Sequence, residues 1–272
     1  MPTKDIIKTR IEQITAVHSG LSHAKSIKPT PVINAHFSSL VDIVQNSDSV
    51  ISNKILNNPK IKKIKKELRS ISAQGEYELE RAWADVLVHS KDIWRDIEQF
   101  PYIENYKSLT DFEMSDIDSC IAHNKKHRVL FIGSGPLPLS SIYMAKKHNL
   151  LIDNVEIDSY AHSLSQKIIH KLKLDSHINN IHSDILDIKD FSKYNLIFVA
   201  ALAGADEKEK MSIIRHIKRY SAKGTHIILR SVVDLGNLLY PKITPAHLKG
   251  LQLINYGVVH SGVINNIIIT KT

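Results

Sequence analysis

The sequence is poor in cysteine and has no long hydrophobic run. Its single cysteine, Cys120, excludes a disulfide within the chain and any metal site built from several thiolates. No apolar run approaches the ~20 residues that a membrane-spanning helix needs. The first residues, MPTKDIIKTRIEQI, carry charges throughout and lack the apolar centre of a signal peptide. We therefore expect a cytoplasmic protein that has no metal cofactor and makes no membrane contact.

Lysine and arginine outnumber the acidic residues, and the formal net charge of the 272-residue chain is +8. Much of the excess lies in NNPKIKKIKKELRS, where Ile61 and Ile64 share one face of a helix and lysines occupy the rest. A basic module that binds nucleic acid is one interpretation. The segment has no aromatic side chains on which bases could stack, so we favour a solvated basic helix and expect no nucleic-acid partner.

The two halves of the chain differ in hydrophobic period. Residues 1–120 repeat apolar positions at intervals of three and four, which predicts helices throughout. In KPTPVIN the prolines separate the first two helices, and Asn34 occupies the expected N-cap position. We predict two domains: an N-terminal helical domain, 1–120, and a Rossmann-like domain, 121–272.

Short β-rich runs alternate with helices in the second half. The expected strands are RVLFI, LIDNVEI, NNIHS, NLIFVAA, THIILRS, LQLINYGVV and INNIIIT, with helices beginning near Pro138, Ser159, Ile188 and Asp206. Only the turn HSGV separates the last two strands, which predicts an antiparallel hairpin at the end of a mostly parallel sheet. The predicted fold class is α/β, with the seven-stranded sheet of class I methyltransferases and an N-terminal all-helical domain.

Three segments should meet at the carboxyl ends of these strands, where sheets of this type bind ligands. Gly133 and Gly135 form a turn after the first strand, where backbone can approach a ligand closely. Glu156 ends the second strand, where a carboxylate can accept both hydrogen bonds of a ribose diol, and Asp158 is a weaker candidate for the same task. Asp184 follows the third strand, well placed for an adenine amino group. These acids could instead be solvent-facing loop residues.

The turn ends in Pro-Leu-Pro, from Pro136 to Pro138, where a dinucleotide site would have a third glycine. Proline has no amide donor, so this helix N-terminus is poorly equipped to bind a pyrophosphate. S-adenosylmethionine carries a sulfonium and no phosphate. The turn therefore favours a nucleoside–sulfonium ligand.

Several longer segments carry a resemblance to a known family. VLFIGSGPLPLSSI, FVAALAGADEKEK, IILRSVVDLGNLLYP and LKGLQLINYGVVHSGVINNIII, with KPTPVINAHFSSLV, GEYELERAWA and FPYIENYKSL, resemble the nicotianamine synthase family over almost the whole chain. The short length is similar to that of archaeal and bacterial members. The lysine-, isoleucine- and asparagine-rich composition favours the bacterial opine-metallophore enzymes of staphylopine type, which transfer one aminobutanoyl unit to histidine.

The resemblance implies an unusual reaction for this fold. An amine attacks the methylene carbon of S-adenosylmethionine that leads to the amino-acid end, which releases 5'-methylthioadenosine. The amine must lose a proton, and by resemblance Glu80 is the residue expected to take it, with Tyr106 as a second catalytic candidate. Glu76, Arg230 and Tyr240 are expected to hold substrate. The domain 121–272 is then the expected S-adenosylmethionine-binding domain, and the helical domain 1–120 is expected to form a lid over the substrate cleft. The residues expected at the cofactor are Gly133, Ser134, Gly135, Pro136, Leu137, Pro138, Glu156, Asp158, Asp184, Ala200 and Ala201.

Each candidate also has a structural interpretation. Glu76 and Glu80 could belong to a solvated helix with Arg81, Tyr106 could be a packed aromatic, and Arg230 could pair with Asp234.

The reaction expected first is transfer of one aminobutanoyl unit to histidine, with D-histidine favoured, in the synthesis of an opine-type metallophore. Its product would pass to a metallophore dehydrogenase. Two alternatives are nicotianamine synthesis, in which three S-adenosylmethionine units are condensed, and a small-molecule methyltransferase. The sequence leaves open the stereochemistry of the acceptor and the oligomeric state, including a homodimer.

Overall fold

The computed structural model describes residues 3–120, 127–258 and 262–272. The first part is helical, as predicted, and comprises α1 (Thr3–Ser22), α2 (Pro31–Gln45), α3 (Ser49–Asn57), α4 (Pro59–His89), α5 (Ile93–Ile97) and α6 (Ile103–Cys120). The prediction that Asn34 caps the second helix is wrong. Thr30 is the N-cap, and its hydroxyl accepts from the amide of Ile33. Pro31 takes the first helical position, where its missing amide costs nothing.

Helix α4 is the longest element and runs without a break through the basic segment and the acid-rich segment GEYELERAWA. The side chain of Asn58 caps its first turn, and Pro59 follows. Gly75 lies within the helix because the ring of Phe37 packs directly on it, where a Cβ would lie 2.2 Å from the ring. The basic segment and the carboxylates Glu76 and Glu80 therefore belong to one continuous helix.

The second part forms one seven-stranded sheet in the order β3-β2-β1-β4-β5-β7-β6. Strands β1 to β5 pair in parallel, whereas β7 runs antiparallel to both β5 and β6. The predicted class and the antiparallel ending are thus confirmed, although part of the HSGV turn lies outside the described residues. The strands are β1 (Arg128–Ile132), β2 (Leu151–Glu156), β3 (Ile178–His182), β4 (Leu196–Val199), β5 (His226–Ser231), β6 (Gln252–Val258) and β7 (Asn266–Lys271).

The connections begin close to the expected positions. Helices α7 (Leu139–His148), α8 (Ser159–Lys171) and α9 (Glu207–Tyr220) follow β1, β2 and β4. After β3 the chain forms only the 3₁₀ turn η1 (Ile185–Asp187), and two further 3₁₀ turns, η2 (Asp234–Leu238) and η3 (Pro245–His247), follow β5. Asp158 and Asp206 cap α8 and α9 with their carboxylates, which explains why both helices begin there.

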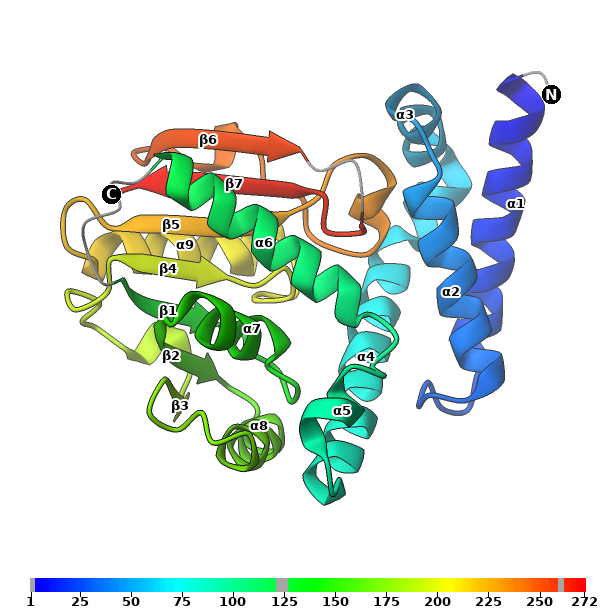
Figure 1. The fold of residues 1–272 in the computed structure, drawn as a ribbon. Helices are drawn as coiled ribbons and strands as arrows, with labels where there is room; N and C mark the ends of the chain where they lie inside the picture. Colours follow the sequence, from blue (N-terminus) through cyan, green and yellow to red (C-terminus); the bar gives the residue numbers. More distant parts are fainter. Residues whose placement is uncertain (1–2, 121–126, 259–261) are drawn as a thin grey trace.

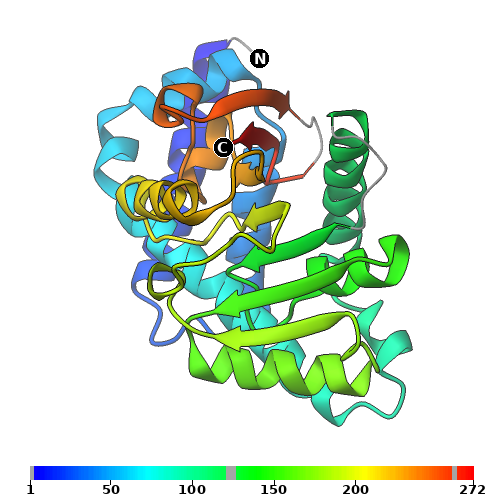
Figure 2. The ribbon, with the colours of Figure 1, turned by 90° about the vertical axis from the view of Figure 1, so that its left-hand side faces the viewer.

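Alternate residues of each strand enter opposite layers of the core. Val129 and Phe131 of β1 pack with α6, α7 and α8 on one face, while Leu130 and Ile132 pack with α9 on the other. Figure 1 shows α6 and α7 in front of the sheet and α9 behind it. The view in Figure 2, turned by 90°, shows the strands from another side, with the N-terminal helices beyond them.

Helix α4 passes the carboxyl-terminal ends of the parallel strands. In Figure 1 the arrowheads of β2 and β4 point toward it. Ala84 and Leu87 of α4 belong to the same apolar cluster as the sheet residues, whereas α1, α2 and α3 pack in a separate cluster with η2. The division at residue 120 stays a prediction. Across the described ranges, no helix is both long and apolar enough to cross a membrane.

Candidate active site

A cavity of about 990 Å³ opens where β1, β2 and β4 end beside α4. Gly133 and Gly135 line it with positive φ angles of 78° and 69°, a conformation that favours glycine. A Cβ on Gly135 would lie 2.8 Å from Oε2 of Glu80, so the absence of a side chain lets the turn approach α4. All of the residues predicted at the cofactor line this cavity: Gly133, Ser134, Gly135, Pro136, Leu137, Pro138, Glu156, Asp158, Asp184, Ala200 and Ala201.

The turn that enters α7 offers hydroxyl groups more than amides. Pro138 is the N-cap of α7 and makes no side-chain cap hydrogen bond. Ser134 and Ser140 line the cavity, and their buried hydroxyl oxygens have no hydrogen-bond partner among the described residues. Because buried polar groups are almost always hydrogen-bonded, these two hydroxyls fit a polar ligand in the cavity. The prolines beside them fit a ligand without phosphate.

The three acids at the strand ends are held in different ways. Glu156 accepts from the amide of Gly135 at 2.8 Å and from that of Asp158 at 3.0 Å, which ties β2 to the glycine turn. Asp158 caps α8 and accepts from the hydroxyl of Tyr77 at 3.1 Å. Asp184 accepts from the amide of Leu186 in η1 at 2.9 Å. Each carboxylate oxygen has lone pairs beyond those used here.

Two carboxylates of α4 face this region, each with a tyrosine partner. The hydroxyl of Tyr106 donates to Glu80 at 2.5 Å, and that of Tyr240 donates to Glu76 at 2.6 Å. Burial raises the pKa of Glu80 well above its usual range, and the nearby Glu76 raises it further. The pKa of Glu76 is also raised by burial, despite the hydrogen bond from Tyr240. Glu80 is 9% exposed, so the solvated-helix interpretation does not describe it.

Arg230 pairs with Glu113 of α6 and not with Asp234. Its Nε donates to one carboxylate oxygen at 2.7 Å and Nη2 to the other at 2.8 Å, with both side chains buried. Asp234 instead accepts from the hydroxyl of Ser49 at 2.9 Å. Arg230 lines the cavity, and Glu113 takes only two of the five donors of its guanidinium. Glu113 therefore fixes the guanidinium of Arg230 in the cavity wall.

A second cavity, of about 420 Å³, lies on the other side of the α4 carboxylates. Its walls come from α2, α4, α6, the segment that follows β5 and the segment that precedes β7, and they include Phe37, Phe100 and Tyr102. Within the described part of the chain its lining contains no lysine or arginine. The two cavities share Glu76, Glu80, Tyr106 and Ile264. A carboxylate with a raised pKa therefore stands in the common wall of two compartments.

Sequence reasoning missed three residues at this site. Glu113 gives no local signal, because its partner Arg230 lies 117 positions away. For Phe37 the sequence indicates only an apolar position in a helix. Lys210 lies in an ordinary charged helix start, yet it is fully buried. Among residues 3–120, 127–258 and 262–272, no group of three or more histidine, cysteine or acidic side chains could hold a metal ion.

Sequence and structure comparisons relate the chain to known proteins. The family model described as nicotianamine synthase protein matches residues 3–272. Nicotianamine synthase 2 of Arabidopsis thaliana is 29% identical over 269 residues, which span 96% of this chain and 83% of that protein. Nicotianamine synthase of Solanum lycopersicum is 27% identical over 265 residues, with the same two shares.

Two similar solved structures are of MtNAS. One is a glutamate-to-glutamine mutant in complex with S-adenosylmethionine, with a TM-score of 0.84, 23% identity and coverage of 96% of this chain and 97% of that one. The other is MtNAS in complex with MTA and tNA, with a TM-score of 0.84, 24% identity and coverage of 100% and 98%. These structures show the same fold, and the family match extends over nearly the whole sequence. The chain belongs to the nicotianamine synthase family.

Proposed function

We propose that this protein transfers the 3-amino-3-carboxypropyl group of S-adenosylmethionine to an amine and releases 5'-methylthioadenosine. The observation that carries the proposal is the pair of cavities with Glu80 and Tyr106 in their common wall. The larger cavity supplies the glycine turn, the unpartnered serine hydroxyls and Glu156, which suit a nucleoside with an amino-acid tail. The smaller one supplies a space for an acceptor on the far side of the carboxylate.

S-adenosylmethionine, when bound, supplies an electrophilic methylene carbon whose bond to sulfur breaks, with its electron pair, as the nitrogen–carbon bond forms. The residues of the chain bind, orient and deprotonate. Glu80 takes the proton that the attacking amine must lose, because its raised pKa makes it a better base than an exposed carboxylate. Tyr106 orients that carboxylate through the 2.5 Å hydrogen bond. Arg230, fixed by Glu113, is positioned to hold the carboxylate of an aminobutanoyl unit.

For the acceptor, we favour nicotianamine synthesis, in which further S-adenosylmethionine units provide the amines. The two relatives described above, 83% of whose length the match covers, are named nicotianamine synthases. One MtNAS structure is in complex with both MTA and tNA. Transfer of one unit to histidine, the reaction first expected from the sequence, is the second candidate. The 420 Å³ cavity with Phe37, Phe100 and Tyr102 in its walls has the aromatic lining that an imidazole ring would contact. The staphylopine-type assignment and its dehydrogenase partner rest on resemblance alone.

Product analysis by mass spectrometry tests the proposal. Purified protein is incubated with S-adenosylmethionine alone and, in parallel, with L-histidine or D-histidine added. We expect methylthioadenosine and a product containing several condensed units without added histidine. A single-unit histidine adduct, formed only with one enantiomer, would replace nicotianamine synthesis by the second candidate. S-adenosylhomocysteine, or no turnover in any mixture, would contradict the transferase itself.

A further inference from the structure

Lys210, in the first turn of α9, has an uncommon environment for a lysine. The residue is fully buried, and its ammonium donates to the carbonyl oxygens of Ala200 and Ala201, both at 2.7 Å. In the described ranges no carboxylate forms an ion pair with it. Burial, together with the nearby charge of Arg230, lowers the pKa of Lys210 to about 7. A buried cation held only by neutral carbonyls is costly, so its presence calls for a reason other than stability.

The two carbonyls belong to the loop that closes the larger cavity. Ala200 and Ala201 follow β4, and both line that cavity beside Gly133. Their carbonyl oxygens are drawn toward α9, which leaves the loop packed against the glycine turn: a Cβ on Gly133 would lie 3.2 Å from that of Ala203. Ala200 has a second donor in the amide of Ala203 at 3.1 Å. For the carbonyl of Ala201, Lys210 is the donor that the described structure provides.

The backbone around Lys210 is arranged so that its side chain can turn back to this loop. Gly204 has a φ of +88°, and a Cβ there would lie 2.7 Å from the amide nitrogen of Lys210, so only glycine lets α9 begin this close. Asp206 caps the helix by accepting from the amide of Glu209 at 3.0 Å, and the Glu209 carboxylate accepts from the amide of Ala205 at 2.9 Å.

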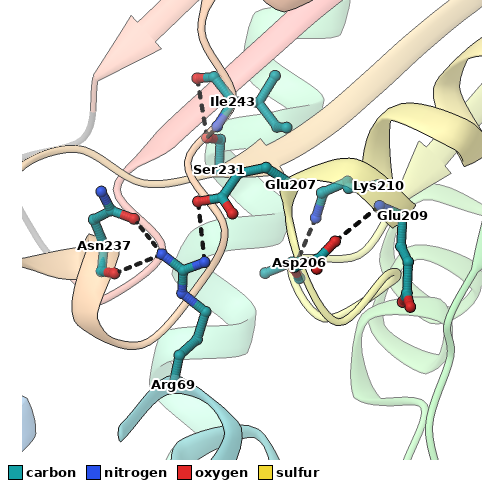
Figure 3. Close-up of polar contacts among 9 residues, drawn as sticks. Arg69, Asp206, Glu207, Glu209, Lys210, Ser231, Asn237 and Ile243 are labelled. Atoms are coloured by element: carbon teal, nitrogen blue, oxygen red, sulfur yellow. Dashed lines mark hydrogen bonds and ion pairs between the residues drawn. The ribbon is translucent and has the colours of Figure 1, made fainter. Parts of the chain in front are cut away.

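The start of α9 is also attached to the helix that carries Glu76 and Glu80. Arg69 of α4 donates to Glu207 at 3.0 Å, and to the carbonyl and side-chain oxygens of Asn237 at 3.0 and 2.6 Å. Figure 3 shows Arg69 reaching up from α4 to Glu207 and Asn237, with the Lys210 side chain directed away from α9 toward its partner. The loop, α9 and α4 are therefore joined by polar contacts, most of them partly buried.

We propose that Lys210 is a positioning residue for the donor: its ammonium anchors the Ala200–Ala201 carbonyls and so shapes the floor on which the adenosine part of S-adenosylmethionine lies. The inference rests on the proposed function, since it takes S-adenosylmethionine as the occupant of the larger cavity. Lys210 touches neither reacting atom and acts through the loop. Its loss should weaken donor binding without slowing the transfer step in equal measure.

Calorimetric binding of S-adenosylmethionine and of methylthioadenosine to wild type, Lys210→Met and Lys210→Gln tests this inference. We expect the Kd of both ligands to rise at least tenfold in both variants, with kcat at saturating donor within threefold of wild type. The Tm of Lys210→Met should be unchanged or higher, because the variant removes a buried charge that lacks a counter-charge. Lys171→Met is the matched control: Lys171 donates to the carbonyl of Val88 at 2.8 Å, away from both cavities, and its loss should leave both Kd values unchanged.

The outcomes separate the two proposals. Unchanged ligand affinity in folded Lys210 variants would overturn the positioning role and leave the proposed function intact. A fall in Tm of more than about 10 °C in both variants would make Lys210 a structural residue and overturn the positioning role as well. If wild type itself binds neither ligand, the proposed function fails, and the role of Lys210 in donor binding fails with it.

Discussion

Removing the carboxylate of Glu113 should destabilise the protein strongly. Arg230 is 3% exposed and Glu113 is 0% exposed, and two hydrogen bonds of 2.7 and 2.8 Å join them. The variant Glu113→Ala leaves the guanidinium buried without its counter-charge, which costs about 3–5 kcal/mol. At about 2–4 °C per kcal/mol for a protein of this size, the Tm should fall by about 6–20 °C. Thermal unfolding followed by circular dichroism, with denaturant unfolding in parallel, measures both quantities.

A second variant distinguishes a lost charge partner from lost packing. Glu113→Leu combined with Arg230→Met removes both charges, so it should recover at least half of the lost stability. Asp111→Ala is the surface control, because the Asp111–Lys147 pair is 41% and 47% exposed and should contribute less than about 1 kcal/mol. A loss below about 1 kcal/mol in Glu113→Ala, or a double variant no more stable than the single one, would refute the reasoning.

Three further predictions concern the common wall and the two cavities. Burial raises the pKa of Glu80, so the folded state favours its protonated form, and the stability of the wild type falls as pH rises through that pKa. Glu80→Gln should therefore raise the Tm more at about pH 8 than at about pH 5. Equal shifts of Tm at the two pH values would contradict this. Gly135→Ala puts a Cβ 2.8 Å from Glu80 at a φ of +69°, which costs about 1–2 kcal/mol of folding free energy. Denaturant unfolding should show that loss, and an unchanged free energy of unfolding would count against the turn geometry. Gly75→Ala displaces the Phe37 ring in the smaller cavity and should change the ratio of singly to multiply extended products while donor affinity stays constant. Gly20→Ala, with a similar clash against His36 outside both cavities, should leave that ratio as in wild type.

The fold could be predicted from local patterns because each element is specified by nearby residues. The apolar runs mark the strands, aspartates cap α8 and α9, and the short last turn indicates the antiparallel hairpin. The N-cap of α2 was mispredicted for a local reason. Asn34 and Thr30 are both good capping residues, but Pro31 fixes the helix start one residue after Thr30. The placement of the basic helix was also a local inference, whereas its continuation into the acid-rich segment was not anticipated.

The site was only partly predictable because its chemistry depends on distant contacts. The glycine turn and the acids after β2 and β3 follow from strand order, which brings carboxyl ends together at one edge. The sequence around Glu113 and Lys210 does not indicate that either side chain is buried. Glu113 is held by an arginine of β5, and Lys210 is held by two backbone carbonyls of the loop after β4. The resemblance to the family, more than the helix pattern, singled out Glu80 from its neighbours Glu76 and Glu78.

The central claim is that Glu80, in the wall between donor and acceptor cavities, deprotonates the attacking amine. The most direct measurement is single-turnover transfer from S-adenosylmethionine labelled with ¹³C in its amino-acid arm, by wild type and by Glu80→Gln, with donor affinity measured on the same samples. In wild type we expect the label in the condensed product and none in methylthioadenosine. In Glu80→Gln we expect transfer slowed by at least about 100-fold with donor Kd within about threefold of wild type. Wild-type transfer rates in Glu80→Gln, or label retained in the adenosine product, would contradict the account.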